Sequence, residues 1–202
     1  MSPKTRKDAH LKGILTKERL VEIKHEVIFM FEECEIITYP IDCFAIAKKL
    51  YYVLRPYTSL NPEEYRKALA TDPDGYSTVE MNPVTGMNEY VIYYNDCAKE
   101  GRMRWTIFHE IGHIYLGHHD NLDDCQTVIE EAEANFFAKY TIAPPPLINL
   151  AKCKSPIDIA MRFNVSGQAS IYIFIYYQKR MQYGPKEYEP FELEMLKLFK
   201  PA

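Results

Sequence analysis

The sequence has no long apolar run, no excess of basic residues and no cysteine pair spaced as CxxC. Its longest apolar stretch, 169–177, is interrupted by Ser170 and is too short to span a bilayer. The opening ten residues lack the apolar segment of a secretory signal. The net charge of -4 gives no electrostatic reason to expect nucleic acid as the main partner. We therefore expect a cytoplasmic protein that does not enter a membrane.

The cysteines are few and odd in number. The five residues are Cys34, Cys43, Cys97, Cys125 and Cys153. This spacing argues against a disulfide framework and against a zinc ribbon built from cysteines, and it fits a reducing compartment. The apolar fraction of 47% and the charged fraction of 26% are those of an ordinary globular protein.

Apolar spacing and breaker residues predict a mostly helical α+β fold. A segment at 60–70 has a good helix start but could be irregular, and 51–54 favours a strand. Two strands at 76–81 and 90–94 are predicted to form a hairpin close to the site described below. The predicted helices cover 17–33, 41–50, 102–116, 127–140, 156–163 and 167–181, with a short amphipathic tail at 191–199.

The pattern His109-Glu110-Ile111-Gly112-His113 carries the predicted chemistry. Residues i and i+4 share one helix face, so the two imidazoles can bind one zinc ion. A catalytic zinc ion keeps three protein ligands and a water molecule, and it lowers the pKa of that water to about 7. Glu110, beside the first histidine, is the predicted general base.

The surroundings of this pattern favour a metal site over two surface histidines. The helix at 102–116 is apolar almost throughout, so it is predicted to be buried. Two buried histidines and a glutamate without partners would cost several kcal/mol, and a metal ion removes that cost. Gly112 in mid-helix indicates that another element approaches closely.

The next helix offers the third ligand. Helical phase places Glu131 on one stripe with Ala132, while Glu133 lies on a different face and is the alternative. Asn135 could orient a ligand histidine or have no special role. His118 and His119 follow the first helix, and we interpret them as exposed loop residues.

Two segments resemble the ImmA/IrrE family of metallo-endopeptidases. Residues 104–113 (RWTIFHEIGH) are similar to the family's R-[RF]-T-L-A-H-E-L-G-H segment, and 131–138 (EAEANFFA) to its E-x-x-A-N-x-F-A segment. The resemblance implies a gluzincin-like, zincin-like domain with one Zn²⁺ per chain. It also implies His109, His113 and Glu131 as ligands and Glu110 as the catalytic acid and base.

Members of this family typically cleave helix-turn-helix transcriptional repressors, so the resemblance implies a repressor encoded nearby as substrate. We expect a metallopeptidase domain at 17–150 and a C-terminal helical segment at 151–202 packed on it, with one continuous domain as the alternative. Residues 157–166 (IDIAMRFNVS) resemble a helix-turn-helix. The following helix begins with small and apolar residues, which favours packing against the peptidase domain over DNA binding.

Two other functions compete with the endopeptidase. A DNA- or partner-binding regulator would use a structural metal site closed by a fourth protein ligand, for which Cys125 is the nearby candidate. A deformylase-like hydrolase would need an upstream cysteine ligand, and Cys97 is not in a suitable motif.

Overall fold

The computed structural model describes residues 15–119 and 128–199 and has the predicted α+β fold, mostly helical with one small sheet. Its elements from the first helix to the hairpin are α2 (Lys17–Glu33), α3 (Cys43–Lys49), β1 (Val53–Pro56), the 3-10 turn η1 (Tyr57–Ser59), α4 (Pro62–Thr71), β2 (Gly75–Met81) and β3 (Asn88–Tyr94). The elements that follow are α5 (Glu100–Tyr115), α6 (Val128–Ile142), α7 (Pro145–Leu150), α8 (Pro156–Phe163), α9 (Gly167–Tyr183) and α10 (Pro190–Leu198).

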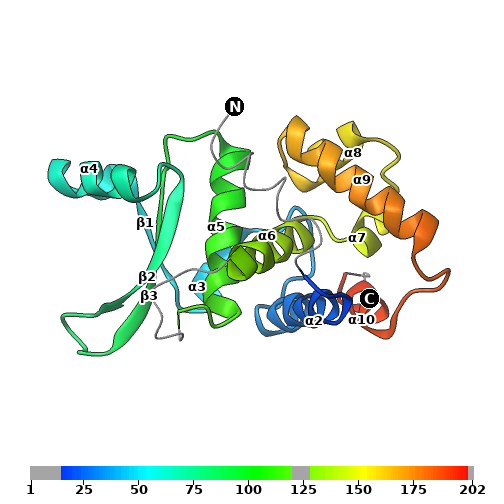
Figure 1. Ribbon diagram of the computed structural model, residues 1–202, viewed down its shortest axis with the longest axis horizontal. Coiled ribbons are helices and arrows are strands. Elements are labelled where there is room, and N and C mark those ends of the chain that lie inside the picture. The colour runs from blue at the N-terminus through cyan, green and yellow to red at the C-terminus, as the bar shows by residue number, and fades with distance from the viewer. Residues whose placement is uncertain (1–14, 120–127, 200–202) are drawn as a thin grey trace.

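The three strands form a sheet in the order β1-β3-β2. β1 runs parallel to β3, with Val53 opposite Val91, and β2 runs antiparallel to β3, with Ser77 opposite Ile92. The predicted hairpin is therefore confirmed. β2 is an outer strand of the described sheet, and the sheet lies on one side of α5 (Figure 1).

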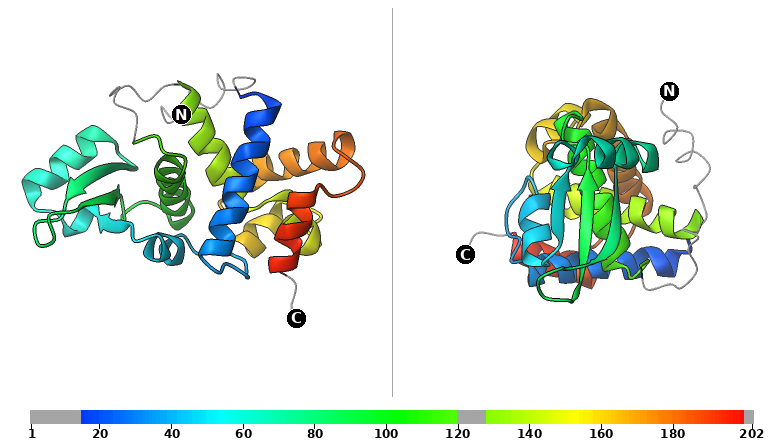
Figure 2. Two further views of the ribbon diagram at one scale, coloured as in Figure 1. Left: turned by 90° about the horizontal axis from the view of Figure 1, so that it is seen from below. Right: turned by 90° about the vertical axis from the view of Figure 1, so that its left-hand side faces the viewer.

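Helix α5 lies between the sheet and α6, and both neighbours approach it at a glycine (Figures 1 and 2). A Cβ at Gly75 of β2 would stand 2.6 Å from Thr106 Cγ2 of α5. A Cβ at Gly112 of α5 would stand 3.0 Å from Phe137 Cδ1 of α6. The close approach predicted at Gly112 is confirmed, and it brings the two site-bearing helices together.

Two helices differ from the sequence interpretation. The 60–70 segment is regular, because Asn61 accepts hydrogen bonds from the backbone N–H groups of Glu63 and Glu64 in a capping box. The sequence predicts only the end of a helix at prolines 144–146. Pro145 also starts α7, since the first position of a helix needs no hydrogen bond from its backbone nitrogen.

The turn between α8 and α9 is attached to α5. Asn164 ends α8 in the left-handed region, at a φ of 50°. The Arg104 guanidinium of α5 donates to the carbonyl oxygens of Phe163, at 3.1 Å, and Asn164, and to that of Ile41 at 2.6 Å. This buried arginine therefore joins α5, the α8–α9 turn and the segment before α3.

The apolar core continues into the C-terminal helices. Ile173 of α9 and Met195 of α10 are buried in one cluster with Ile23 of α2. The start of α9 is less buried than its apolar sequence suggests, since Ile171 is 50% and Tyr172 is 62% exposed. The predicted boundary between 150 and 151 stays a prediction. Within 15–119 and 128–199, no helix is long and apolar enough to cross a membrane.

Candidate metal centre

Helix α5 presents two buried imidazoles on one face, one turn apart. His109 is 6% exposed and His113 is 1% exposed. Their Nε2 atoms face each other at 3.1 Å, and their rings lie nearly perpendicular. The i and i+4 spacing has therefore produced the predicted convergence of two nitrogen donors.

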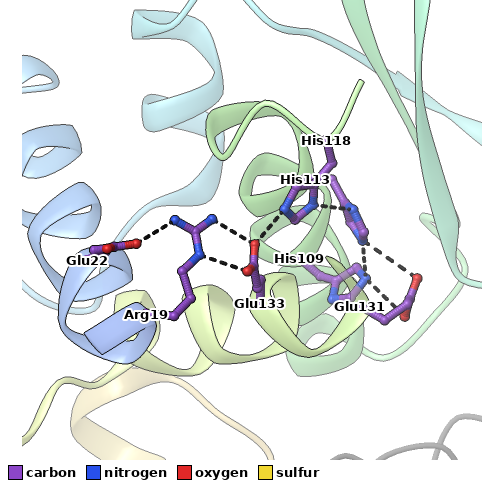
Figure 3. A network of polar contacts seen from close by, with 7 residues as sticks. All are labelled: Arg19, Glu22, His109, His113, His118, Glu131 and Glu133. Atoms are coloured by element: carbon purple, nitrogen blue, oxygen red, sulfur yellow. Dashed lines mark hydrogen bonds and ion pairs between the residues drawn. The ribbon is translucent and has the colours of Figure 1, made fainter. Parts of the chain in front are cut away.

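Helix α6 brings the carboxylate of Glu131 to the same point (Figure 3). Its Oε1 lies 3.7 Å from His113 Nε2, and its Oε2 lies 3.9 Å from His109 Nε2. One ligand atom from each of the three residues lies within 4.8 Å of the others. In the described part of the chain, this is the group of histidine, cysteine and acidic side chains that could hold a metal ion.

The spacing of these donors fits zinc. Ligand atoms about 2.0–2.2 Å from a tetrahedral zinc ion lie about 3.3 Å from one another. The two ring nitrogens lie 3.1 Å apart, and a different oxygen of Glu131 faces each of them, at 3.7 and 3.9 Å, so all three separations lie within about 0.6 Å of that value. Two imidazole nitrogens and one carboxylate also form the three-ligand set that is typical of catalytic zinc.

Glu110 projects from α5 toward the sheet and is 5% exposed. The Ser77 hydroxyl of β2 donates to Glu110 Oε2 at 2.8 Å. The same Ser77 oxygen lies 2.9 Å from His119 Nε2, and the His119 ring lies 6.0 Å from that of Tyr90. Ser77 therefore contacts the predicted base on the side of the hairpin, and His119 in turn contacts Ser77.

Glu133, the alternative third ligand, points away from the three donors (Figure 3). Its Oε1 accepts from Arg19 Nε at 2.8 Å, and its Oε2 accepts from Arg19 Nη2 at 2.8 Å. Oε2 also lies 3.0 Å from His118 Nε2. Although burial acts in the opposite direction, hydrogen bonds from Arg19 and His118 lower the pKa of Glu133. The hydrogen bond to Glu133 raises the pKa of Arg19.

The exposed-loop interpretation of His118 is wrong, because its side chain is only 5% exposed. Its Nδ1 lies 2.9 Å from Nδ1 of His113. The end of α5 explains this contact. Gly117 has a φ of 75° and donates to the carbonyl of Ile114 at 3.0 Å, while the His118 N–H donates to that of His113 at 3.0 Å. This pair of bonds is a Schellman motif, which returns the chain over the last turn of the helix.

The sequence holds a signal for this arrangement. A glycine that ends a helix in the left-handed region places the next residue beside the residue five positions earlier. Gly117 followed by His118 therefore indicates a contact with His113. Asn135, by contrast, forms no hydrogen bond with His109 or His113 among the described side chains. Cys125, the candidate fourth ligand of a structural site, lies outside the described residues.

Comparison with known protein families shows the family to which the chain belongs. The sequence pattern of the IrrE N-terminal-like domain, a peptidase family, matches residues 60–172. This segment is more than half of the 202 residues. The chain belongs to this family, and so to the ImmA/IrrE metallopeptidases that the sequence resembles. Comparison with curated proteins found no match. The matched segment contains α5 and α6 with all three predicted ligands, whereas Arg19 on α2 precedes it.

Proposed function

We propose that the protein is a zinc-dependent endopeptidase in which His109, His113 and Glu131 hold the ion and Glu110 is the general base. The convergence of the three ligand atoms within 4.8 Å supports this proposal most strongly. A bound zinc ion would make water more acidic and would polarise the carbonyl of a peptide bond. Three protein ligands leave room for the water and the substrate.

The chain's own residues supply the proton transfers. Glu110 follows His109 directly on α5, and in our proposal its carboxylate accepts the proton of the attacking water. The same carboxyl group can then donate that proton to the amine that leaves. The hydrogen bond from Ser77 holds one carboxylate oxygen, Oε2, in place.

The outer strand of the sheet supports a protein substrate. β2 carries Ser77, which touches the predicted base, and it is hydrogen-bonded to β3 on one side in the described sheet. An extended peptide can add to such an edge through main-chain hydrogen bonds. A peptide that adds there passes beside Glu110. The family resemblance supports a helix-turn-helix repressor, encoded nearby and present in the cytoplasm, as the source of that segment.

Co-expression with such a repressor tests the proposal. We expect the wild-type protein to contain one zinc ion per chain and to convert the repressor into a clipped product. Glu110→Gln should retain the zinc and reduce cleavage by about 10²–10⁴-fold, because general acid–base catalysis typically contributes that factor. Glu194→Gln on α10, an exposed carboxylate far from the site, is the matched control and should cleave normally.

Two results would contradict the proposal. A Glu110→Gln variant that cleaves at the wild-type rate would remove Glu110 from the chemistry. A wild-type protein that leaves the repressor intact but needs its zinc for repressor or DNA binding would favour a regulator with a structural metal site.

A further inference from the structure

On the side of the site formed by α2 and α6, which we call the helix side, a network of polar side chains contacts His113, a proposed ligand. We call His118, Glu133 and Arg19 the helix-side network. His113 points Nε2 toward His109 and Glu131, and its other ring nitrogen, Nδ1, meets His118 Nδ1 at 2.9 Å. The network therefore contacts the ligand on the side that faces away from the proposed metal position (Figure 3).

The donor and acceptor groups of Arg19 and Glu133 determine the direction of the other hydrogen bonds in this network. Arg19 is only a donor, and the ionised carboxylate of Glu133 is only an acceptor. In its neutral form the His118 ring must then carry its proton on Nε2, which donates to Glu133 Oε2 at 3.0 Å. Its Nδ1 is left as an acceptor, so the Nδ1 of His113 must donate to it.

This direction determines which nitrogen of His113 can bind a metal ion. A neutral imidazole carries one proton, and in His113 the network keeps that proton on Nδ1. The lone pair is then on Nε2, the atom that faces His109 and Glu131. A ligand histidine whose tautomer is already correct does not have to rearrange when the ion binds.

Burial makes the network rigid and costly to leave incomplete. The side chains of His118 and Glu133 are 5% and 8% exposed. Both carboxylate oxygens of Glu133 are engaged by Arg19, which crosses from α2 to α6. At the outer end, Arg19 Nη1 donates at 3.0 Å to Glu22, whose side chain is 60% exposed. Arg19 itself is 35% exposed, so exposure rises along the series from His118 to Glu22.

We propose that His118, held by Glu133 and Arg19, is a positioning residue that fixes the tautomer and orientation of His113 for zinc binding. The inference rests on the proposed metal site and extends it to residues outside the HExxH pattern. It gives Glu133, which lies two positions after Glu131 in the family's second segment, a role other than ligation.

Zinc affinity and imidazole NMR together test this role. Dissociation constants are measured with zinc alone against a chromophoric chelator, and ¹⁵N-labelled imidazoles of the zinc-free protein report which nitrogen carries the proton. In the wild type we expect the proton of His113 on Nδ1. His118→Ala and Glu133→Gln should each weaken zinc binding by about 10–100-fold, the usual effect of losing such a partner. Both should also give His113 a mixture of tautomers.

Two further variants separate positioning from general stability. The side-chain oxygen of asparagine can replace Nδ1 of the imidazole, so His118→Asn should recover part of the affinity lost in His118→Ala. Glu22→Gln, at the solvent end of the network, should bind zinc like the wild type. A merely structural role would lower the melting temperature of the zinc-free variants and leave both affinity and tautomer unchanged, which would overturn the proposal.

Zinc binding by the wild-type protein distinguishes failure of the proposed metal site from failure of the proposed positioning role of His118. Wild-type protein that does not bind zinc contradicts the metal site itself and, with it, the positioning role. Zinc binding that is equally tight in wild type, His118→Ala and Glu133→Gln contradicts the positioning role alone. A His113 proton found on Nε2 in the zinc-free wild type would do the same.

Discussion

The two sides of the candidate site are built differently. On the helix side, His113 contacts His118, which is followed by the buried Glu133 of α6 and the half-buried Arg19 of α2. On the sheet side, Glu110 contacts Ser77 on β2, which is an outer strand. The helix side contacts a proposed ligand through charged partners, whereas on the sheet side the proposed base accepts a hydrogen bond from a neutral hydroxyl on an outer strand of the described sheet.

This difference suggests a division of labour. Charged and buried hydrogen bonds are strong and directional, and they suit a ligand that must stay fixed. A neutral hydroxyl can be exchanged or displaced more easily, which suits a base whose proton moves during each turnover. Changes on the helix side should therefore alter metal binding, and changes on the sheet side should alter the rate.

Removing the Ser77 hydroxyl should give the largest effect on the sheet side. Ser77→Ala takes away the donor to Glu110 Oε2, and a hydrogen bond to a charged group contributes about 1.5–3 kcal/mol. We expect cleavage of the repressor to slow by about 10–100-fold with zinc affinity unchanged. Thr78→Val, the next residue on β2, is the control, because its side chain lies on the opposite face. Loss of zinc from Ser77→Ala would remove the proposed division between the two sides.

Lys139, a half-buried charge on α6, can be compared with Glu133 on the same helix. Glu133 is met by Arg19 and His118, whereas the Lys139 nitrogen lies 4.2 Å from the ring centre of Tyr176 and 4.8 Å from that of Phe136. Burial, helped by the charge of Lys24, lowers the pKa of Lys139 from 10.5 to about 8. Below pH 8 the folded protein carries the full cost of the charged form. Between pH 8 and 10.5 the unfolded chain binds more protons, so this lysine makes stability rise with pH.

Lys139→Met should remove that cost. We expect the free energy of unfolding at pH 7 to increase by about 1–3 kcal/mol, and the contribution that rises between pH 8 and 10.5 to disappear. Urea unfolding at several pH values, compared with the exposed Lys179→Met, measures both effects. A Lys139→Met protein that is less stable than the wild type at pH 7 would show that the contacts with Phe136 and Tyr176 outweigh the desolvation.

The parts of the site that the sequence predicts depend on local geometry. Helical periodicity places His109 and His113 one turn apart, and phase separates Glu131 from Glu133. The shared face of the histidines and the choice of Glu131 therefore follow from spacing, whereas the approach of α6 to α5 is a matter of packing. Contacts between distant segments are not predictable in this way. Ser77 reaches Glu110 through the register of the hairpin and its packing on α5, 33 residues away. Arg19 reaches Glu133 across 114 residues, a pairing that no local pattern encodes.

The fold shows the same limit. The helix over 17–33, the hairpin and the start of α8 are predicted because caps, breakers and periodicity agree there. The sequence interpretation misses α7, since three consecutive prolines indicate the end of one helix more readily than the start of another. It also misses the burial of His118, which depends on the conformation of the preceding glycine.

The smallest expected effect on zinc binding comes from replacing Gly117. Gly86, in the hairpin on the sheet side, provides the matched control. Gly117 has a φ of 75° beside the helix-side network, and Gly86 has a φ of 69° in the hairpin, where an added Cβ would meet no atom within 4 Å. An alanine in this region costs about 1 kcal/mol, so both variants should lose similar stability in urea unfolding. Only Gly117→Ala disturbs the turn that carries His118, and we expect its zinc affinity alone to fall several-fold. Equal zinc affinities in the two variants would mean that His118 reaches His113 without help from the Schellman motif, and the division between the two sides would then rest on Glu133 and Arg19.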